Sequence, residues 1–480
     1  MVANSRELDA AVAATRFGLG AKAGEIATAA ADPRGWLKAQ IRPEGAETFD
    51  MGGDTGATRL AAFREYRKQR QAAKQGGDGP GKAAGDEDDA VKMARQFIRK
   101  EAAGDVAGRL QLAVGTDAPF RERWALFWAN HFTVSATKVQ VATLVGPYEN
   151  EAIRPHVFGR FGDLLAAAET HPAMLLYLDQ AQSIGPHSRA AEFLAAGGRR
   201  PGFGGGKRAG GLNENLAREI LELHTVGVDG GYTQADVTEF ARALTGLGIG
   251  GPRDMAFEDK VVFREPAHEP GPRTVMGVKY PDGSARAQAG AVLGDLAAKP
   301  QTAKFVCTKI ARHFVADDPP PALVARLQKT WMATGGDLGR VAATLIDSPE
   351  PWSAPPTKFK TPYEFVVSSY RAVGFAPAQA GPQVNGVLNG LGQRPFGAPS
   401  PKGWPDEAAP WAASDAIVKR MAFAQSLGGR MGPNVQDPMA LADATLGARL
   451  TPAAATAIRR AESRAEAVAL LVMTPEFQRR

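Results

Sequence analysis

The chain has 480 residues, of which 44% are hydrophobic and 22% charged, the composition of a globular protein and not of a disordered one. Its 57 lysines and arginines exceed its 51 acidic residues by only 6, and without a dense basic stripe we expect no nucleic acid partner. The single cysteine, Cys307, excludes an internal disulfide and any cysteine-based zinc site.

Many helix starts are marked by a capping residue followed directly by proline. The residues with such a side chain are Asp32, Ser348, Thr361, Asp437, Thr451 and Thr474. The side-chain oxygen accepts a backbone N–H of the first turn, where proline loses no hydrogen bond. Apolar residues mostly recur at intervals of three and four, the spacing of one helix face. The sequence therefore predicts an all-α fold, a mainly helical multi-helix body.

One region between residues 260 and 280 has strand character instead. Residues 261–263 and 274–278 are rich in β-branched and aromatic residues and flank a proline-rich connection. We expect these two segments to form one small β-hairpin on the helical body.

Composition also predicts how the chain is divided. Residues 1–70 read as an N-terminal helical segment, residues 71–90 as a flexible low-complexity linker, and residues 91–480 as the main helical domain. Within that domain the glycine-rich stretch 197–211 is expected to be a mobile insertion. Both glycine-rich stretches have too little apolar surface to offset the entropy of ordering.

The sequence gives no sign of a membrane span or of a secretory signal. No apolar run approaches the roughly 20 residues that a transmembrane helix needs. The N-terminus has no basic region that leads into an apolar stretch. We therefore expect a soluble cytoplasmic protein.

The most polar helix is expected over residues 213–226. On a regular wheel, Asn215, Arg218, Glu219, Glu222 and Thr225 fall within an arc of about 120°. Such an arc is either a solvated face with an Arg218–Glu222 pair or the wall of a cleft. The same wheel places His224 about 160° from Glu222, on the apolar side, which is typical of a core histidine.

Several motifs along the chain are similar to those of the domain-of-unknown-function 1800 family. They are the run from Asn213 to Gly246, Arg16 to Gly20, Asn130-His131-Phe132, His171 to Met174 with Tyr177 to Asp179, Lys309 to Val315, Leu391 to Gln393 and Ser400 to Pro405. The chain departs from the family pattern in three places: Ala129 replaces the first histidine of a Trp-His-Asn-His-Phe block, His268-Glu269 replaces His-Asp, and Lys299 replaces part of a His-Pro pair.

The resemblance bears on partners and location but not on the reaction. The family has no settled reaction, and its signature includes the polar arc. Family members are often encoded beside exported proteins, so export with a carrier stays open. The resemblance also implies frequent genetic pairing with the domain-of-unknown-function 1501 family.

Two functions follow as hypotheses. The first is an enzyme with its cleft on the signature helix, residues 213–226. The expected catalytic residues are Glu219, Glu222, His131, Asp179 and His268. The expected substrate-binding residues are Asn213, Asn215 and Arg218. Loop-borne ionisable groups such as His268 favour function, whereas His131 at the end of an aromatic stripe is equally compatible with a core role. The second hypothesis is a non-catalytic binding or assembly partner of a domain-of-unknown-function 1501 protein.

The signature helix offers oxygen ligands and no cysteine, so a bound ion would be a hard cation such as magnesium or calcium. Arg218 lies in the same arc and would repel it. The sequence therefore favours a metal-free site in which Arg218 binds an anionic substrate. The sequence does not identify a cofactor.

Overall fold

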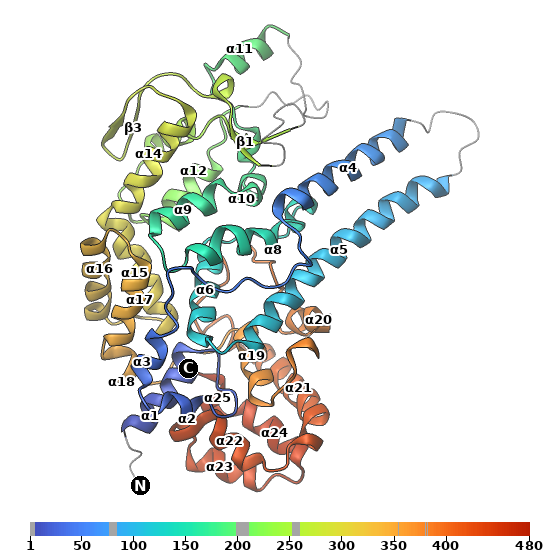
Figure 1. The fold of residues 1–480 in the computed structure, drawn as a ribbon, viewed down its shortest axis with the longest axis vertical. Helices are drawn as coiled ribbons and strands as arrows, with labels where there is room; N and C mark the ends of the chain where they lie inside the picture. The colour runs from blue at the N-terminus through green and yellow to red at the C-terminus, as the bar shows by residue number, and fades with distance from the viewer. Residues whose placement is uncertain are drawn as a thin grey trace.

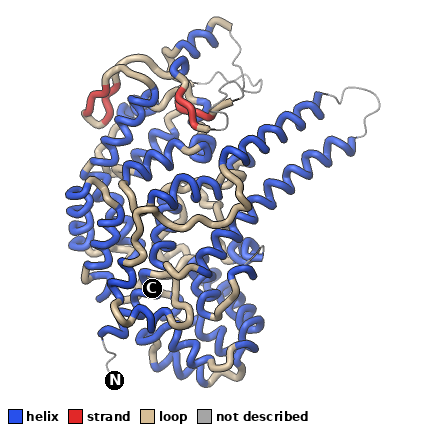
Figure 2. Tube along the Cα trace, in the orientation of Figure 1, coloured by secondary structure: helices blue, strands red, loops and turns tan. Residues whose placement is uncertain are grey.

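The computed structural model describes residues 5–75, 84–197, 211–251, 260–353, 355–379, 381 and 383–480. It is an elongated, mainly helical body from which two long helices project as a pair (Figures 1 and 2). The predicted all-α class with minor β structure is confirmed.

The N-terminal part and the projecting pair come first along the chain. Their helices are α1 (Ser5–Val12), the π-helical turn Ala13–Phe17, α2 (Glu25–Ala29), α3 (Pro33–Lys38), α4 (Gly56–Gln75) and α5 (Ala84–Gly115). The last five residues of α4 and the first residues of α5 are helical where the sequence predicts the flexible linker 71–90. The remainder of that linker, residues 76–83, lies outside the described residues.

The upper half of the body in Figure 1 carries the signature run. Its helices are α6 (Pro119–His131), α7 (Val139–Ala142), α8 (Val145–Tyr148), the π-helical turn Glu149–Ile153, α9 (Phe161–Thr170), α10 (Pro172–Tyr177), α11 (Arg189–Ala195), α12 (Asn215–Glu219), the π-helical turn Ile220–His224 and α13 (Gln234–Ala243). Most of the predicted mobile insertion 197–211 lies outside the described residues.

The rest of the body is built from the helices that follow along the chain. They are α14 (Ala285–Ala298), α15 (Pro300–Phe314), α16 (Pro321–Thr334), α17 (Leu338–Asp347), α18 (Glu350–Ser353), α19 (Pro362–Ala372), α20 (Gln383–Gly390), α21 (Ser414–Met431), α22 (Pro438–Leu446), α23 (Pro452–Arg459), α24 (Arg464–Met473) and α25 (Pro475–Gln478).

Five of the six predicted caps are present. The side chains of Asp32, Thr361, Asp437, Thr451 and Thr474 accept backbone N–H groups at the starts of α3, α19, α22, α23 and α25. Ser348 behaves differently, because its hydroxyl donates to the Thr344 carbonyl of the preceding helix at 2.7 Å.

The strand pairing differs from the prediction. In the described part of the chain the strands form two small antiparallel sheets, β1 (Leu247–Ile249) with β2 (Val261–Phe263) and β3 (Arg273–Val275) with β4 (Val278–Tyr280). The two predicted strand segments are therefore not partners of each other. Met276 and Gly277, both at positive φ, turn the chain between β3 and β4. A two-residue turn of this kind favours local pairing over pairing across the longer proline-rich connection.

Buried apolar side chains form two clusters. The larger joins elements from α1 to α18, and the smaller joins the C-terminal half of α5 to α19–α25. The N-terminal segment belongs to the larger cluster, because the Phe17 ring lies 6.2 Å from those of Phe120 and Phe314 and 5.0 Å from that of Trp352.

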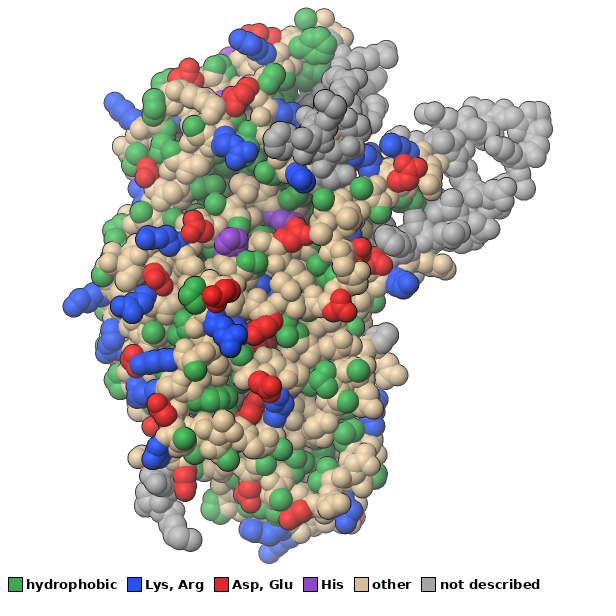
Figure 3. All heavy atoms as spheres, in the orientation of Figure 1, with side chains coloured by type: hydrophobic (Ala, Val, Ile, Leu, Met, Phe, Trp, Pro, Cys, Tyr) green, Lys and Arg blue, Asp and Glu red, His purple; other side chains and the backbone are tan. Residues whose placement is uncertain are grey.

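Charged side chains of both signs are interspersed on the face shown in Figure 3. Among the described residues, no helix combines the length and apolarity needed to cross a membrane.

Candidate functional site

The signature run is not a regular α-helix. After α12 it continues as the π-helical turn Ile220–His224, and the Thr225 hydroxyl donates to the Ile220 carbonyl, five residues back, at 2.7 Å. A π-helix has hydrogen bonds between residues five positions apart, so such residues lie near each other on the same side of the helix. The wheel of 3.6 residues per turn fails from this point, and Glu219 and His224 come within electrostatic reach of each other.

His224 is buried and forms an acid–base pair. Its Nδ1 lies 2.6 Å from Oε1 of Glu169 on α9, and both side chains are almost completely buried. His224 is therefore buried in the core, as expected. Its partner is the ionisable carboxyl of Glu169, which the sequence did not reveal. Glu219 is half-buried and interacts electrostatically with both members of this pair.

The carboxyl of Glu219 is a weakened acid. Burial, followed by the charges of Glu222 and Glu169, raises its pKa, while His224 and Arg218 oppose that rise. Burial and the charge of Glu219 also raise the pKa of Tyr177 to about 12.

The other residues of the predicted polar arc bind to neighbours on the surface. Arg218 donates to Glu214 at 3.1 Å and to Gln234 at 2.8 Å, and not to Glu222. Glu222 accepts a hydrogen bond from the Tyr232 hydroxyl at 3.3 Å.

The two asparagines differ in exposure. Asn213 accepts from the backbone N–H of Asn215 at 2.9 Å and donates to the Leu178 carbonyl at 3.0 Å, whereas Asn215 is exposed. The signature helix therefore contacts the segment that carries Tyr177 and Asp179.

His131, Asp179 and His268 take separate partners. The Nε2 atom of His131 lies 3.1 Å from the His224 carbonyl oxygen, which joins it to the signature run. Asp179 has a left-handed backbone with φ 60° and accepts a hydrogen bond from Lys138 at 2.7 Å. His268 is buried, with Nδ1 3.0 Å from the Thr245 carbonyl oxygen. Catalytic roles for these three residues stay predictions.

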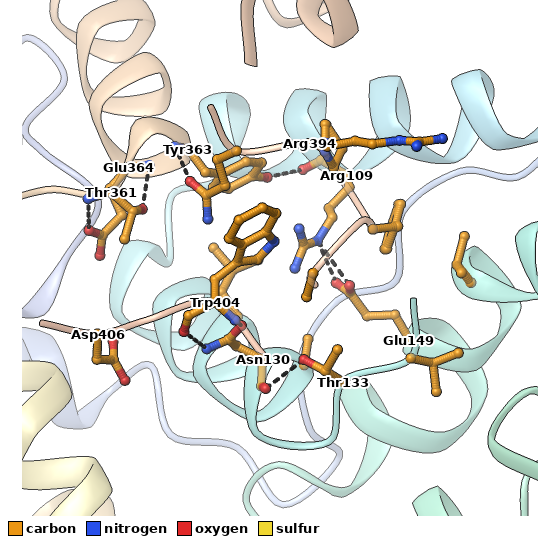
Figure 4. A pocket seen from close by; sticks show the side chains of 18 of the residues that line it. Arg109, Asn130, Thr133, Glu149, Thr361, Tyr363, Glu364, Arg394, Trp404 and Asp406 are labelled. Carbon is orange, nitrogen blue, oxygen red and sulfur yellow. Dashed lines mark hydrogen bonds and ion pairs between the residues drawn. The ribbon is translucent and has the colours of Figure 1, made fainter. Parts of the chain in front are cut away.

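A different set of residues lines a cavity of about 110 Å³ between the two apolar clusters (Figure 4). Its walls come from α5, α6, the turn Glu149–Ile153, α15, α19 and the segment 393–406. Phe396 in that segment adopts φ 48°, which is rare for a bulky side chain and is found mostly where surrounding structure enforces it. None of the eight predicted site residues lines this cavity.

Two of the sequence motifs meet at the cavity wall. The side-chain amide of Asn130 donates to the Trp404 carbonyl at 2.9 Å and accepts from the Trp404 backbone N–H at 2.8 Å (Figure 4). The neighbouring Gly403 has φ 84°, and a Cβ there would lie 2.8 Å from Oδ1 of Asn130. Asn130 therefore fixes the backbone that carries the Trp404 indole into the cavity.

His313, near the end of α15, forms a dyad with Asp406 in the cavity wall. Its Nδ1 lies 2.7 Å from Oδ1 of Asp406, and its buried Nε2 has no hydrogen-bond partner among the described residues. Burial and the charges of Arg480 and Arg123 lower the pKa of His313 to about 4, although Asp406 opposes the shift. Burial alone would raise the pKa of Asp406, but chiefly His313 lowers it to about 2.

The lowered pKa of both groups favours a neutral His313 beside an ionised Asp406 at neutral pH. In that state the hydrogen bond between them requires the imidazole proton on Nδ1. The Nε2 atom then carries a free lone pair.

Two ionic networks frame the cavity. In the first, Glu149 accepts from Nε of Arg109 at 3.1 Å and from Arg154 at 2.7 Å, and Arg154 also binds Glu122 at 2.7 Å. In the second, Glu364 binds Arg123 and, at 2.9 Å, Arg480. Buried charges are tolerable when paired in this way.

Sequence reasoning missed His313, Asp406 and Arg109 as site residues. A signal existed for His313, which lies in the Lys309 to Val315 block, and for Asp406, which directly follows the Ser400 to Pro405 block. Arg109 has no such signal, because it is one of several charged residues in a long helix.

A family model described as "Protein of unknown function (DUF1800)" matches residues 12–479. No curated protein and no solved structure matches the chain. Within the described residues, no three His, Cys, Asp or Glu side chains gather in a way that could hold a metal ion.

Proposed function

Because the chain belongs to the DUF1800 family, whose description assigns no activity, we propose from the geometry of the cavity that the protein is an enzyme working by general base catalysis. The observation that carries this proposal is the His313–Asp406 dyad. A neutral histidine oriented by a carboxylate, with its second nitrogen free, has the form of a catalytic base.

In this proposal His313 accepts a proton from the substrate, or from a water that attacks it, on Nε2. Asp406 acts as a positioning residue, because its bond to Nδ1 selects the tautomer and stabilises the imidazolium that forms. The low pKa of His313 keeps the base unprotonated throughout the neutral range. The same low pKa makes it a weak base, so proton transfer depends on the ionised Asp406 stabilising the imidazolium that forms.

We propose an acid–base role for Glu219 as well, separate from the His313–Asp406 dyad because Glu219 does not line the cavity. Its raised pKa and its position beside the buried His224–Glu169 pair support this role. A carboxyl that is easier to protonate than usual is suited to donate a proton as well as to accept one.

Binding is the alternative function for the signature helix. Asn215 is exposed and 39% of the Arg218 side chain is accessible, so this face is available to another protein. The family resemblance suggests a domain-of-unknown-function 1501 protein as that partner. Size-exclusion chromatography of the two proteins together tests it: loss of a common peak in Arg218→Ala would support binding through this face.

The enzyme proposal is tested by incubating the protein with mixtures of small polar metabolites and following their consumption by mass spectrometry. We expect at least one compound to be consumed, with a roughly 10²- to 10⁴-fold lower rate in His313→Gln. Asp406→Asn should lower kcat while leaving KM nearly unchanged.

Glu407→Gln provides the matched control, since Glu407 adjoins Asp406 and 44% of its side chain is exposed. It should retain the wild-type rate. Equal rates in wild type and His313→Gln would rule out His313 as the base.

A further inference from the structure

Each carboxylate that lines the cavity already binds at least one donor or cationic side chain. Glu149 accepts from Arg154 and Arg109, Glu364 from Arg480, Arg123 and the Thr361 backbone, and Asp406 from His313. A cationic ligand would therefore have to compete with a partner that each of these carboxylates already binds.

Donor groups, by contrast, are left free. Arg109 uses only Nε for its bond to Glu149, and neither terminal guanidinium nitrogen hydrogen-bonds to a described residue. The indole N–H of Trp404 and the amide nitrogen of Gln393 also have no hydrogen-bond partner in the described part of the chain. Free donors that face a cavity suit a ligand rich in acceptor oxygens.

Arg109 is held ready for such a ligand. Glu149 fixes Nε, and the guanidinium carbon lies 5.1 Å from the ring centroids of both Tyr363 and Phe396. In Figure 4 the guanidinium group and the Trp404 indole point toward the same space. Only 15% of the Arg109 side chain is exposed, so its terminal nitrogens have limited access to solvent.

We infer that the cavity binds a small organic acid, with the carboxylate of that acid on the two terminal nitrogens of Arg109. The planar guanidinium fork matches a carboxylate in a bidentate arrangement. Apolar side chains, among them Leu126, Val134 and Val145, also line the cavity and suit a hydrocarbon skeleton better than a free phosphate ion.

The size of the cavity limits that skeleton. An engineered apolar cavity of about 150 Å³ holds one benzene molecule. A cavity of about 110 Å³ therefore suits an acid with a short carbon chain. The binding of this acid to Arg109 does not depend on the function proposed above. Only the further statement that the acid presents an exchangeable proton to His313 rests on that function.

Butyrate and its neutral analogue butyramide are the probes for this inference. Their binding is followed through the indole N–H signal of Trp404 in NMR spectra, identified by its loss in Trp404→Phe. We expect butyrate to shift this signal at millimolar concentration, and butyramide to bind about tenfold or more weakly because it lacks the charge. Equal binding of the two probes would overturn the inference, as would tighter binding of inorganic phosphate than of butyrate.

Variants assign the contact to Arg109. Arg109→Gln should weaken butyrate binding about tenfold or more. Arg109→Lys keeps the charge beside Glu149 but loses the fork, so it should fold and still bind several-fold more weakly than wild type. Arg340→Gln, which removes an exposed charge outside the cavity, is the matched control and should bind as wild type does.

Two further variants distinguish Arg109 from the neighbouring Arg394 as the binding residue, and butyrate binding from catalysis by His313. Arg394 lies exposed at the cavity, and loss of binding in Arg394→Gln with retention in both Arg109 variants would overturn the assignment. His313→Gln should still bind butyrate. A protein that binds butyrate through Arg109 but whose turnover is unaffected by His313→Gln would support this inference while contradicting the proposed function.

Discussion

Gly403 gives the sharpest test of how the cavity wall is held. Its φ of 84° costs an alanine about 1–2 kcal/mol in the left-handed region. An added Cβ would also lie 2.8 Å from Oδ1 of Asn130, 2.9 Å from Oγ1 of Thr133 and closer still to the Asn130 carbonyl oxygen. Because that oxygen belongs to helix backbone, relief requires a backbone shift, which costs about 1–3 kcal/mol in a packed site.

We therefore expect Gly403→Ala to lower the free energy of unfolding by roughly 2–5 kcal/mol. Urea unfolding measures this loss, and the Trp404 indole signal reports whether the local hydrogen bonds to Asn130 break first. The matched control is Gly392→Ala, because Gly392 has φ 90° but a Cβ added there would have no atom within 4 Å. It should lose only the backbone contribution, about 1–2 kcal/mol. Equal losses in the two variants, with the Trp404 signal unchanged in Gly403→Ala, would show that close packing against Asn130 does not hold this wall.

Two further predictions concern buried charges. Because burial lowers the pKa of His313 to about 4, the unfolded chain binds a proton between about pH 6.5 and 4 that the folded chain does not. The free energy of unfolding should therefore fall as the pH is lowered through this window. Urea unfolding at several pH values should show a smaller fall in His313→Gln than in the wild type. An identical fall in the two proteins would contradict the lowered pKa of His313. Asp105→Asn removes the buried bidentate partner of Arg59 at 2.7 and 2.9 Å and should cost about 2–4 kcal/mol in urea unfolding. The control is Glu65→Gln, which breaks an exposed ion pair and should cost less than about 0.5 kcal/mol. Similar losses in Asp105→Asn and Glu65→Gln would mean that burial does not set the strength of these ion pairs.

The helical class and most helix starts were predictable because they depend on local chemistry. A capping oxygen such as that of Thr361 and the proline after it act within one turn, so the sequence shows them directly. Strand pairing was less accessible, because β1 was not predicted and the partner of each strand depends on turn geometry.

The candidate site was harder to predict for two physical reasons. The π-helical turn Ile220–His224 changes which residues share a side, and a wheel of fixed period cannot anticipate it. The cavity joins Arg109, His313 and Asp406 across nearly 300 residues of chain, and only tertiary packing brings such residues together. The sequence motifs indicated where such residues lie, but not that they meet.

The proposed function depends above all on His313 being a neutral base with its free lone pair on Nε2. Nitrogen-15 NMR of histidine-labelled protein measures this directly, since the signals of one of the seven histidines disappear in His313→Gln. We predict a neutral imidazole with its proton on Nδ1 at pH 6.5, protonated only near pH 4. An imidazolium at pH 6.5, or a neutral ring with its proton on Nε2, would contradict the proposal.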